Sequence, residues 1–162
     1  ERGRRRLAWI GQLGISSTRQ RFEGFRDALN DHNLVCDRVL VKEIRLASPM
    51  HVGEDLVREL VRELVRKKTR PDAILFENDS LALAGLEELR RLGIDVPGEI
   101  SVAGFDDDPE SARSQPPLTT VAQPMEQIGE EALRLLIATA GDRSLPPKQV
   151  LLPVELIIRQ SS

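Results

Sequence analysis

The amino-acid sequence predicts an α/β fold with a mainly parallel sheet flanked by helices. Apolar runs rich in β-branched residues alternate along the chain with segments of helical periodicity, which is typical of parallel strands joined by helical crossovers. The length of 162 residues, with 40% hydrophobic and 30% charged residues, suits one soluble globular domain with a sizeable core.

Six short apolar runs predict the strands. Each combines apolar and β-branched residues over a length that suits a strand. In chain order they cover residues 7–13, 39–41, 73–76, 100–105, 119–122 and 150–158.

Two helices are predicted in the first half of the chain. Phe22, Phe25 and Leu29 recur at helical spacing, and Ser16 or Ser17 can provide the N-cap of that helix. A second helix has a broad apolar face over residues 56–65. Oppositely charged residues four positions apart on its other side support a solvated surface there.

Two further helices are predicted downstream. Asp79 can cap a third helix that stops at Gly93, and Pro124 can open a fourth that runs to Gly141. The two Pro-Pro pairs of the sequence bracket residues 118–145, which can form a semi-separate unit before the last strand returns to the main body.

The charge and composition exclude several kinds of partner. The formal net charge is −3, with no Tyr, one Trp and four Phe, whereas a nucleic-acid surface needs a basic stripe with aromatic residues. The chain itself is therefore not expected to bind DNA. No apolar run approaches the roughly 20 residues of a membrane span.

The start of the chain and its one cysteine bear on the cellular compartment. The chain begins with Glu1 rather than Met, so we expect that an upstream segment has been removed. The basic start has no apolar segment of a secretory signal. Cys36 is the single cysteine and cannot form an internal disulfide, which fits a reducing cytoplasm.

Polar residues follow three of the predicted strands. The first strand is followed by residues 11–17 and Arg21, the third by residues 77–79 and the fourth by residues 106–108. Ligands of parallel sheets bind beyond the carboxyl ends of the strands. The arginine, amide and carboxylates of this rim can hydrogen-bond a polyhydroxylated or heterocyclic ligand.

Arg21 lies at the edge of the apolar face of the first helix, one turn beyond the strand end. An arginine there can extend its planar set of donors over the ligand site. It can equally be a surface residue paired with a nearby carboxylate. Helical geometry alone does not separate these two interpretations.

The acidic run Asp106–Asp108 also has two interpretations. Clustered carboxylates at a strand end can hold magnesium for phosphoryl transfer, but the partner strand end, Glu77–Ser80, lacks a suitable arrangement. Asp108 before Pro109 is also typical of a cap for backbone donors. Capping and ligand hydrogen bonding are favoured over a metal.

Other motifs do not favour catalysis. The Gly11-x-x-Gly14 stretch lacks the spacing of a dinucleotide or phosphate loop. His32 and His51 lie apart without a third zinc ligand, and Ser80 lacks a glycine-flanked nucleophile elbow. We therefore expect no enzyme activity, no metal and no cofactor.

Several stretches resemble the LacI/GalR family of bacterial transcription regulators. They occur in the family's order and together extend over essentially the whole chain. They read STRQRFEGF at 17–25, RPDAI at 70–74, ND at 78–79, VPGEISVAGFDD at 96–107, PPLTTVAQP at 116–124 and LPVELIIR at 152–159.

The resemblance implies a two-lobed fold like that of type I periplasmic binding proteins, with the ligand between the lobes. Residues 1–120 would form the carboxyl-side lobe, and residues 121–144 a crossover segment that packs on the amino-side lobe. Residues 145–162 would return as a strand to the carboxyl-side lobe. The amino-side lobe and a helix-turn-helix head would precede Glu1.

The resemblance also implies roles for particular residues. The expected ligand contacts are Arg21, Asn78 and Asp106, with Ser17 added at the same rim. The expected dimer contacts are Leu83, Glu110 and Arg113. The family often places Trp or Phe a few residues before the glycine matched by Gly53, but residues 45–50 hold no aromatic residue. A small polar ligand other than a stacked sugar therefore stays open.

The sequence thus predicts a cytoplasmic effector-sensing domain of a repressor-type regulator. A sugar or similar polar metabolite would change the affinity of the helix-turn-helix head for operator DNA, in a homodimer without membrane association. The alternative is a solute-binding protein of a sugar transporter, and a magnesium-dependent phosphotransferase using Asp106 ranks below it. The apolar helix face formed by Ile128, Ala132, Leu135 and Leu136 predicts self-association when it is left uncovered.

Overall fold

The computed structural model describes residues 3–45, 53–140 and 148–162. Six strands, four α-helices and two short 3₁₀ helices make up these residues. They are β1 (Leu7–Gly11), α1 (Ser16–Asp31), η1 (Arg38–Leu40), β2 (Val41–Glu43), α2 (Glu54–Arg66), β3 (Ala73–Phe76), α3 (Asp79–Arg91), β4 (Ser101–Ala103), η2 (Pro109–Ala112), β5 (Thr120–Ala122), α4 (Met125–Ala140) and β6 (Glu155–Ile157).

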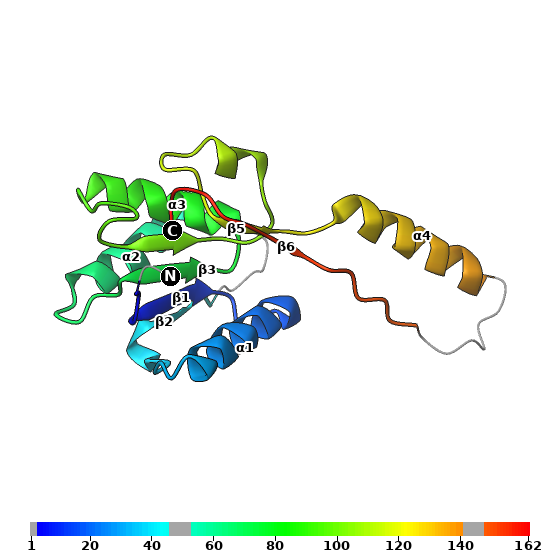
Figure 1. Ribbon diagram of the computed structural model, residues 1–162, viewed down its shortest axis with the longest axis horizontal. Coiled ribbons are helices and arrows are strands. Elements are labelled where there is room, and N and C mark those ends of the chain that lie inside the picture. The colour runs from blue at the N-terminus through cyan, green and yellow to red at the C-terminus, as the bar shows by residue number, and fades with distance from the viewer. Residues whose placement is uncertain (1–2, 46–52, 141–147) are drawn as a thin grey trace.

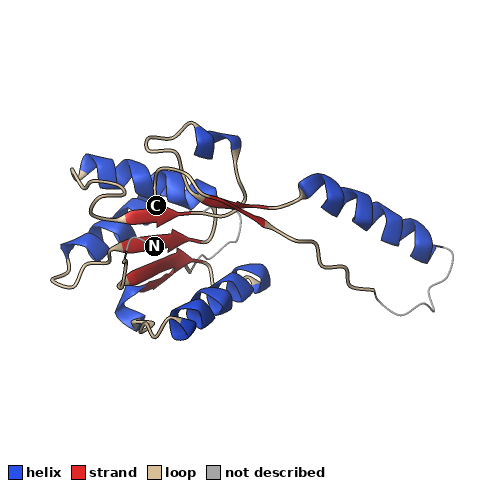
Figure 2. Ribbon diagram, in the orientation of Figure 1, coloured by secondary structure: helices blue, strands red, loops and turns tan. Residues whose placement is uncertain are grey.

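The main body is a parallel sheet in the order β2-β1-β3-β4. Helix α1 lies on one face of the sheet, and α2 and α3 lie on the other (Figure 1). Figure 2 shows the resulting three layers of helix, sheet and helix. The predicted α/β class with a mainly parallel sheet is confirmed.

The central strand β1 packs on both faces of the sheet. Ala8 and Ile10 are fully buried on the side of α2 and α3, whereas Trp9 packs with Phe25 and Leu29 of α1. Burial on both faces explains why this strand is a continuous apolar run rather than an alternating one. Each large apolar side chain buried here stabilises the fold by about 1.5–3 kcal/mol.

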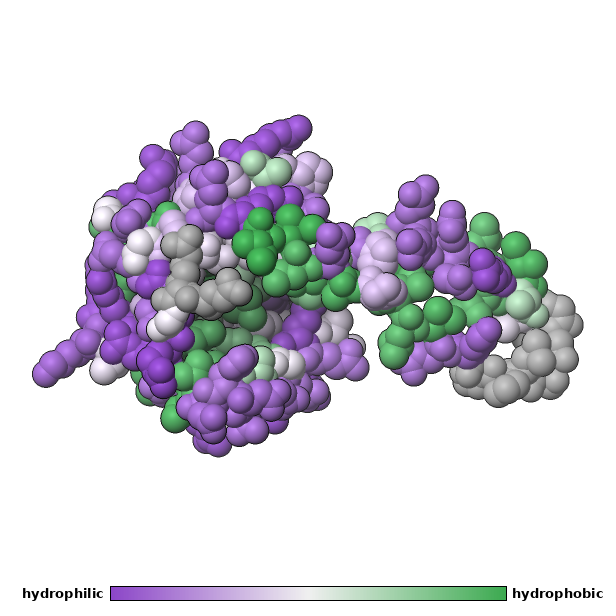
Figure 3. All heavy atoms as spheres, in the orientation of Figure 1, coloured by the Kyte–Doolittle hydropathy of each residue, from purple (hydrophilic) through white to green (hydrophobic). Residues whose placement is uncertain are grey.

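An antiparallel ribbon of β5 and β6 connects the main body to α4, which extends away from it (Figure 1). The described residues of α4 include none that is buried. Leu136 and Ile137 are 64% and 67% exposed. Figure 3 shows apolar surface along this helix and along the extended segment beside it.

Five predicted strands are shorter or shifted, the fifth only by the loss of residue 119. The predicted strand 39–41 is mostly η1, because the Asp37 side chain accepts a hydrogen bond from Val39 N at 2.9 Å and caps a helical turn. The first and fourth strands end early, at Gly11 and Ala103. Of the last predicted strand only Glu155–Ile157 pairs, because its partner β5 is equally short.

The start of α1 also corrects the sequence-based prediction. The N-cap is Ile15, which makes no side-chain hydrogen bond, and the helix already includes Ser16 and Ser17. The helix therefore begins without the predicted serine cap.

The start of α3 is likewise shifted by one residue. Asn78, not Asp79, is the N-cap, and its Oδ1 accepts a hydrogen bond from Leu81 N at 3.0 Å. Gly93 follows this helix with φ 71°, the left-handed conformation expected of a stop. The predicted stop of α4, Gly141, lies outside the described residues.

Candidate functional site

Arg21 crosses from α1 to the ends of two strands. Its Nη1 donates to the carbonyl oxygen of Glu77 at 2.7 Å, and its Nη2 lies 3.6 Å from Asp106 Oδ1. The guanidinium carbon lies 3.8 Å from the centroid of the Phe105 ring. Arg21 does pair with a carboxylate, but that carboxylate is itself a predicted ligand contact.

Aromatic packing below the rim fixes the rotation of α1. The Trp9 ring centroid lies 5.5 Å from that of Phe22 and 5.6 Å from that of Phe25. These contacts are favourable beyond the buried area alone. Because they hold one face of α1 on the sheet, Arg21 is placed at the carboxyl ends of the strands.

Glu77 links the ends of β1 and β3. Its carboxylate is buried and accepts hydrogen bonds from the backbone N of Gln12 and from its Nε2 at 3.1 Å. The two strand ends approach closely, since a Cβ at Gly11 would lie 2.8 Å from the Glu77 Cβ. Only glycine fits at that position without displacement.

Asp106 projects from a strained turn. Its φ is 115°, a conformation that favours glycine, and its Oδ1 accepts a hydrogen bond from Gln123 Nε2 at 2.7 Å. Partial burial raises the pKa of the Asp106 carboxyl; Arg21 and Gln123 act against this, and Asp79 and Glu77 add to it. With a side chain 43% exposed, the carboxylate can accept hydrogen bonds from a ligand.

Asn78 and Ser17 complete the predicted ligand contacts. Asn78 follows Glu77 directly, and its Oδ1 is used as the cap of α3, which leaves the amide group to donate. Ser17 is exposed in the first turn of α1, the turn that precedes Arg21. The structure thus brings Arg21 and Asp106 together, places Asn78 next to the carbonyl that Arg21 binds, and leaves Ser17 exposed near the same end of α1.

Two rim residues were not singled out from the sequence. Phe105 lies under the Arg21 guanidinium, and Gln123 binds Asp106. Both lie within stretches of the sequence that resemble the LacI/GalR family. Gln123 follows the end of β5 just as Glu77 follows that of β3. The sequence signal for Gln123 is therefore its place as a polar residue directly after the fifth strand.

The other acids of the turn have structural partners. Asp107 Oδ1 accepts a hydrogen bond from Arg159 Nη2 at 2.6 Å. Asp108 Oδ1 accepts one from Glu110 N at 2.9 Å, which confirms the predicted cap. In residues 3–45, 53–140 and 148–162, no group of three or more His, Cys, Asp or Glu side chains is arranged to hold a metal ion. Within the same residues, no helix has the length and apolarity needed to cross a membrane.

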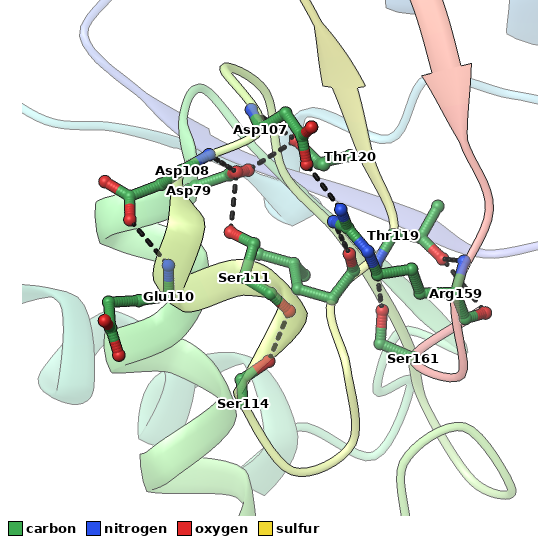
Figure 4. A network of polar contacts seen from close by, with 11 residues as sticks. Asp79, Asp107, Asp108, Glu110, Ser111, Ser114, Thr119, Thr120, Arg159 and Ser161 are labelled. Atoms are coloured by element: carbon green, nitrogen blue, oxygen red, sulfur yellow. Dashed lines mark hydrogen bonds and ion pairs between the residues drawn. The ribbon is translucent and has the colours of Figure 1, made fainter.

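Of the predicted dimer contacts, Leu83 lies on α3, Glu110 lies in η2 and Arg113 directly follows η2. Leu83 is half-buried, whereas Glu110 and Arg113 are exposed and form an ion pair at 2.8 Å. Figure 4 shows Glu110 at the edge of the polar network, joined to it through Asp108.

A parallel sheet with an arginine, an amide and a carboxylate at the carboxyl ends of its strands is typical of ligand-binding α/β domains. All residues from 1 to 162 match the family described as the periplasmic binding protein-like domain. A probable opine utilization operon repressor of Rhizobium rhizogenes is 34% identical, over 99% of this chain and 82% of its own length.

Two further proteins show the same relationship. The transcriptional regulator DegA of Bacillus subtilis is 31% identical over 94% of this chain and 43% of its own length. The solved complex of the transcriptional regulator CelR with cellobiose has a TM-score of 0.87 at 30% identity, covering 99% of this chain and 47% of that chain. The chain therefore spans less than half the length of these two proteins.

The chain belongs to the periplasmic-binding-protein-like domain family and corresponds to the effector-binding domain of LacI-type transcription regulators.

Proposed function

We propose that this chain is the effector-sensing lobe of a repressor-type transcription regulator. A small polar molecule binds at the rim formed by Ser17, Arg21, Asn78 and Asp106. Binding favours one arrangement of two lobes over another and so changes the affinity of a helix-turn-helix head for operator DNA.

The arrangement of Arg21 carries this proposal. Its guanidinium is held by the Glu77 carbonyl oxygen, the Phe105 ring and Asp106, and the Arg21 side chain is 23% exposed. The planar donors of a fixed arginine and the acceptors of a fixed carboxylate suit a ligand with both hydroxyl and carbonyl or ring-nitrogen groups. No covalent or proton-transfer chemistry is needed for this role, so the proposed function is regulatory rather than catalytic.

A sugar or a similar polar metabolite is the proposed effector class. The matched CelR structure was solved with cellobiose. Residues 45–50 provide no aromatic ring to stack on a sugar, and all but Arg45 lie outside the described residues. A non-sugar polar metabolite therefore remains the alternative within this class.

The proposed protein is a cytoplasmic homodimer. Leu83, Glu110 and Arg113 would contact the partner subunit, and operator DNA would be bound only through the head. Residues 121–144, which include the exposed helix α4, would pack on an amino-side lobe, and residues 145–162 would return to the lobe formed by residues 1–120. The relatives named above are transcription regulators, which favours this function over a solute-binding protein of a transporter.

A ligand screen on the full-length protein tests the proposal. Operator binding is measured by fluorescence anisotropy in the presence of single mono- and disaccharides, opines and purine bases. At least one compound should change the operator affinity by about fivefold or more, because coupling free energies of about 1–3 kcal/mol are typical. A full-length protein that binds no DNA and instead carries an export signal would contradict the proposal.

A further inference from the structure

Asp79 is a fully buried carboxylate that the ligand rim does not use. It is 1% exposed, and three donors surround it (Figure 4). Its Oδ1 accepts from Thr120 Oγ1 at 2.6 Å, and its Oδ2 accepts from Ser111 Oγ at 2.7 Å and from Asp108 N at 2.9 Å. A buried carboxylate with three donors is satisfied, and it fixes the groups that donate to it.

These donors come from three different parts of the chain. Asp108 belongs to the turn that carries Asp106, Ser111 belongs to η2, and Thr120 begins β5. The backbone N of Asp79 also donates to the carbonyl oxygen of Phe105 at 2.8 Å. One residue at the start of α3 thus holds both ends of the turn between β4 and η2.

The turn needs such support because its backbone is strained. Asp106 and Asp107 have φ values of 115° and 56°, and non-glycine residues rarely adopt these values without compensation. Asp107 N also donates to Thr120 Oγ1 at 3.3 Å, so the hydroxyl that binds Asp79 supports the strained residue as well. The position of Asp106 therefore depends on the Asp79 hydrogen bonds.

Gly104 shows how closely the turn approaches Asp79. A Cβ at residue 104 would lie 2.1 Å from Asp79 Oδ1 and 3.2 Å from its Cα. The backbone of the turn at Gly104 therefore packs directly against Asp79.

We propose that Asp79 is a positioning residue that couples the ligand rim to the outer turn η2. A ligand that moves Asp106 moves the backbone that donates to Asp79, and Ser111 then shifts the turn that carries Glu110. This inference rests on the proposed function, in which Asp106 contacts the effector and Glu110 contacts the partner subunit.

The test removes the donors to Asp79 one at a time, since Asp79→Ala would remove the acceptors of all three. Ser111→Ala and Thr120→Val each leave the carboxylate with two donors. Ser114→Ala is the matched control: its hydroxyl donates to the carbonyl oxygens of Ser111 and Pro116 and not to Asp79. Amide hydrogen exchange of the full-length protein is followed by mass spectrometry without ligand.

We expect Ser111→Ala and Thr120→Val to speed exchange of residues 104–108 by about tenfold, the loss of one hydrogen bond to a charged group. Exchange in the sheet should be unchanged, and Ser114→Ala should leave residues 104–108 as in the wild type. The proposal is contradicted if Ser111→Ala changes exchange only within η2.

Coupling itself is tested with a rim substitution. Arg21→Ala releases Asp106 and should change the amide exchange of residues 110–113 by several-fold when it is the single substitution, but not in the Ser111→Ala background. An equal change in both backgrounds would overturn the proposal. If Asp79 had only a structural role, the effects of Arg21→Ala and Ser111→Ala on amide exchange would be independent of each other. Because no ligand is used, this outcome is independent of whether an effector is found.

Discussion

Arg21 Nη2 lies 3.6 Å from Asp106 Oδ1, which joins the first helix to the turn after the fourth strand. The contact matters because both residues are predicted ligand contacts on different elements. An arginine and a carboxylate held this way give an incoming ligand both donors and acceptors without a large change in the side chains.

The first prediction concerns the stability of the Asp106 turn as pH changes. Burial raises the pKa of the Asp106 carboxyl above its ordinary value of 3.8. The folded state therefore holds this proton more tightly than the unfolded state, so the carboxyl's contribution to stability is present below pH 3.8 and is lost as pH rises through the folded pKa. Asp106→Asn should raise the denaturant midpoint at pH 7 relative to the wild type, and should have little effect at pH 3.5.

The matched control is Asp27→Asn, since Asp27 is exposed on α1. It should show no such difference between the two pH values. The burial argument would be contradicted if Asp106→Asn changed the denaturant midpoint, relative to the wild type, by the same amount at both pH values.

The second prediction concerns Gly104. Gly104→Ala places a methyl group 2.1 Å from Asp79 Oδ1 and should lower the free energy of unfolding by about 2 kcal/mol or more, because overpacking and the lost hydrogen bonds add. Gly24→Ala is the matched control: in the middle of α1, a Cβ there meets none of the described residues within 4 Å, so it should stabilise by roughly 0.5–1 kcal/mol. Urea unfolding curves measure both changes. Equal changes in the free energy of unfolding for the two variants would contradict the close approach of residue 104 to Asp79.

The third prediction concerns the ion pair between α2 and α3. Glu88 is 2% exposed, and its Oε1 accepts from Arg62 Nε at 2.7 Å, while its Oε2 is buried without a partner in the described residues. Arg62→Ala should cost about 1–3 kcal/mol because it leaves the buried Glu88 carboxylate without its donor. Glu88→Met should be neutral or stabilising, and the double substitution should be more stable than Arg62→Ala alone. If thermal unfolding instead showed Glu88→Met to be less stable than the wild type, and the double substitution to be less stable than Arg62→Ala, the ion pair would be a net source of stability.

The fourth prediction concerns self-association through α4. A groove lined by Ile128 and Leu135 of this helix and by Val150, Leu151 and Val154 of the facing segment is apolar and open. The 162-residue chain by itself should therefore self-associate at high concentration. Leu135→Glu should shift the light-scattering mass toward the monomer, whereas Thr139→Glu on the same helix should do so less. A strictly monomeric wild type at millimolar concentration would contradict this prediction.

The fold and the location of the site could be predicted from the sequence because both depend on local patterns. The alternation of strands and helices predicted the parallel sheet, and the polar residues after the first, third and fourth strands predicted the rim. The sequence could not decide which residue caps α3, because Asn78 and Asp79 are adjacent and both suit an N-cap. In the structure Asn78 is the cap and the Asp79 side chain is buried.

The role of Asp79 could not be predicted for a different reason. Its donors Ser111 and Thr120 lie more than 30 residues away in the chain, and nothing in their spacing indicates that they meet. The same holds for Gln123, whose contact with Asp106 depends on a short bridge between Asp106 and Ala122. Long-range pairing, unlike helix periodicity, leaves no regular pattern in a single sequence.

The most direct measurement is calorimetric titration of the screened effector into the full-length protein and into its Arg21→Ala variant. Arg19→Ala is the control, because Arg19 is exposed on the same turn and, among the described residues, its side chain donates only to the carbonyl oxygen of Leu13. We expect Arg21→Ala to weaken effector binding by at least about tenfold, the loss of charge-assisted hydrogen bonds, while operator affinity is kept and Arg19→Ala binds as the wild type does. Unchanged effector affinity in Arg21→Ala would contradict the assignment of this rim as the effector site.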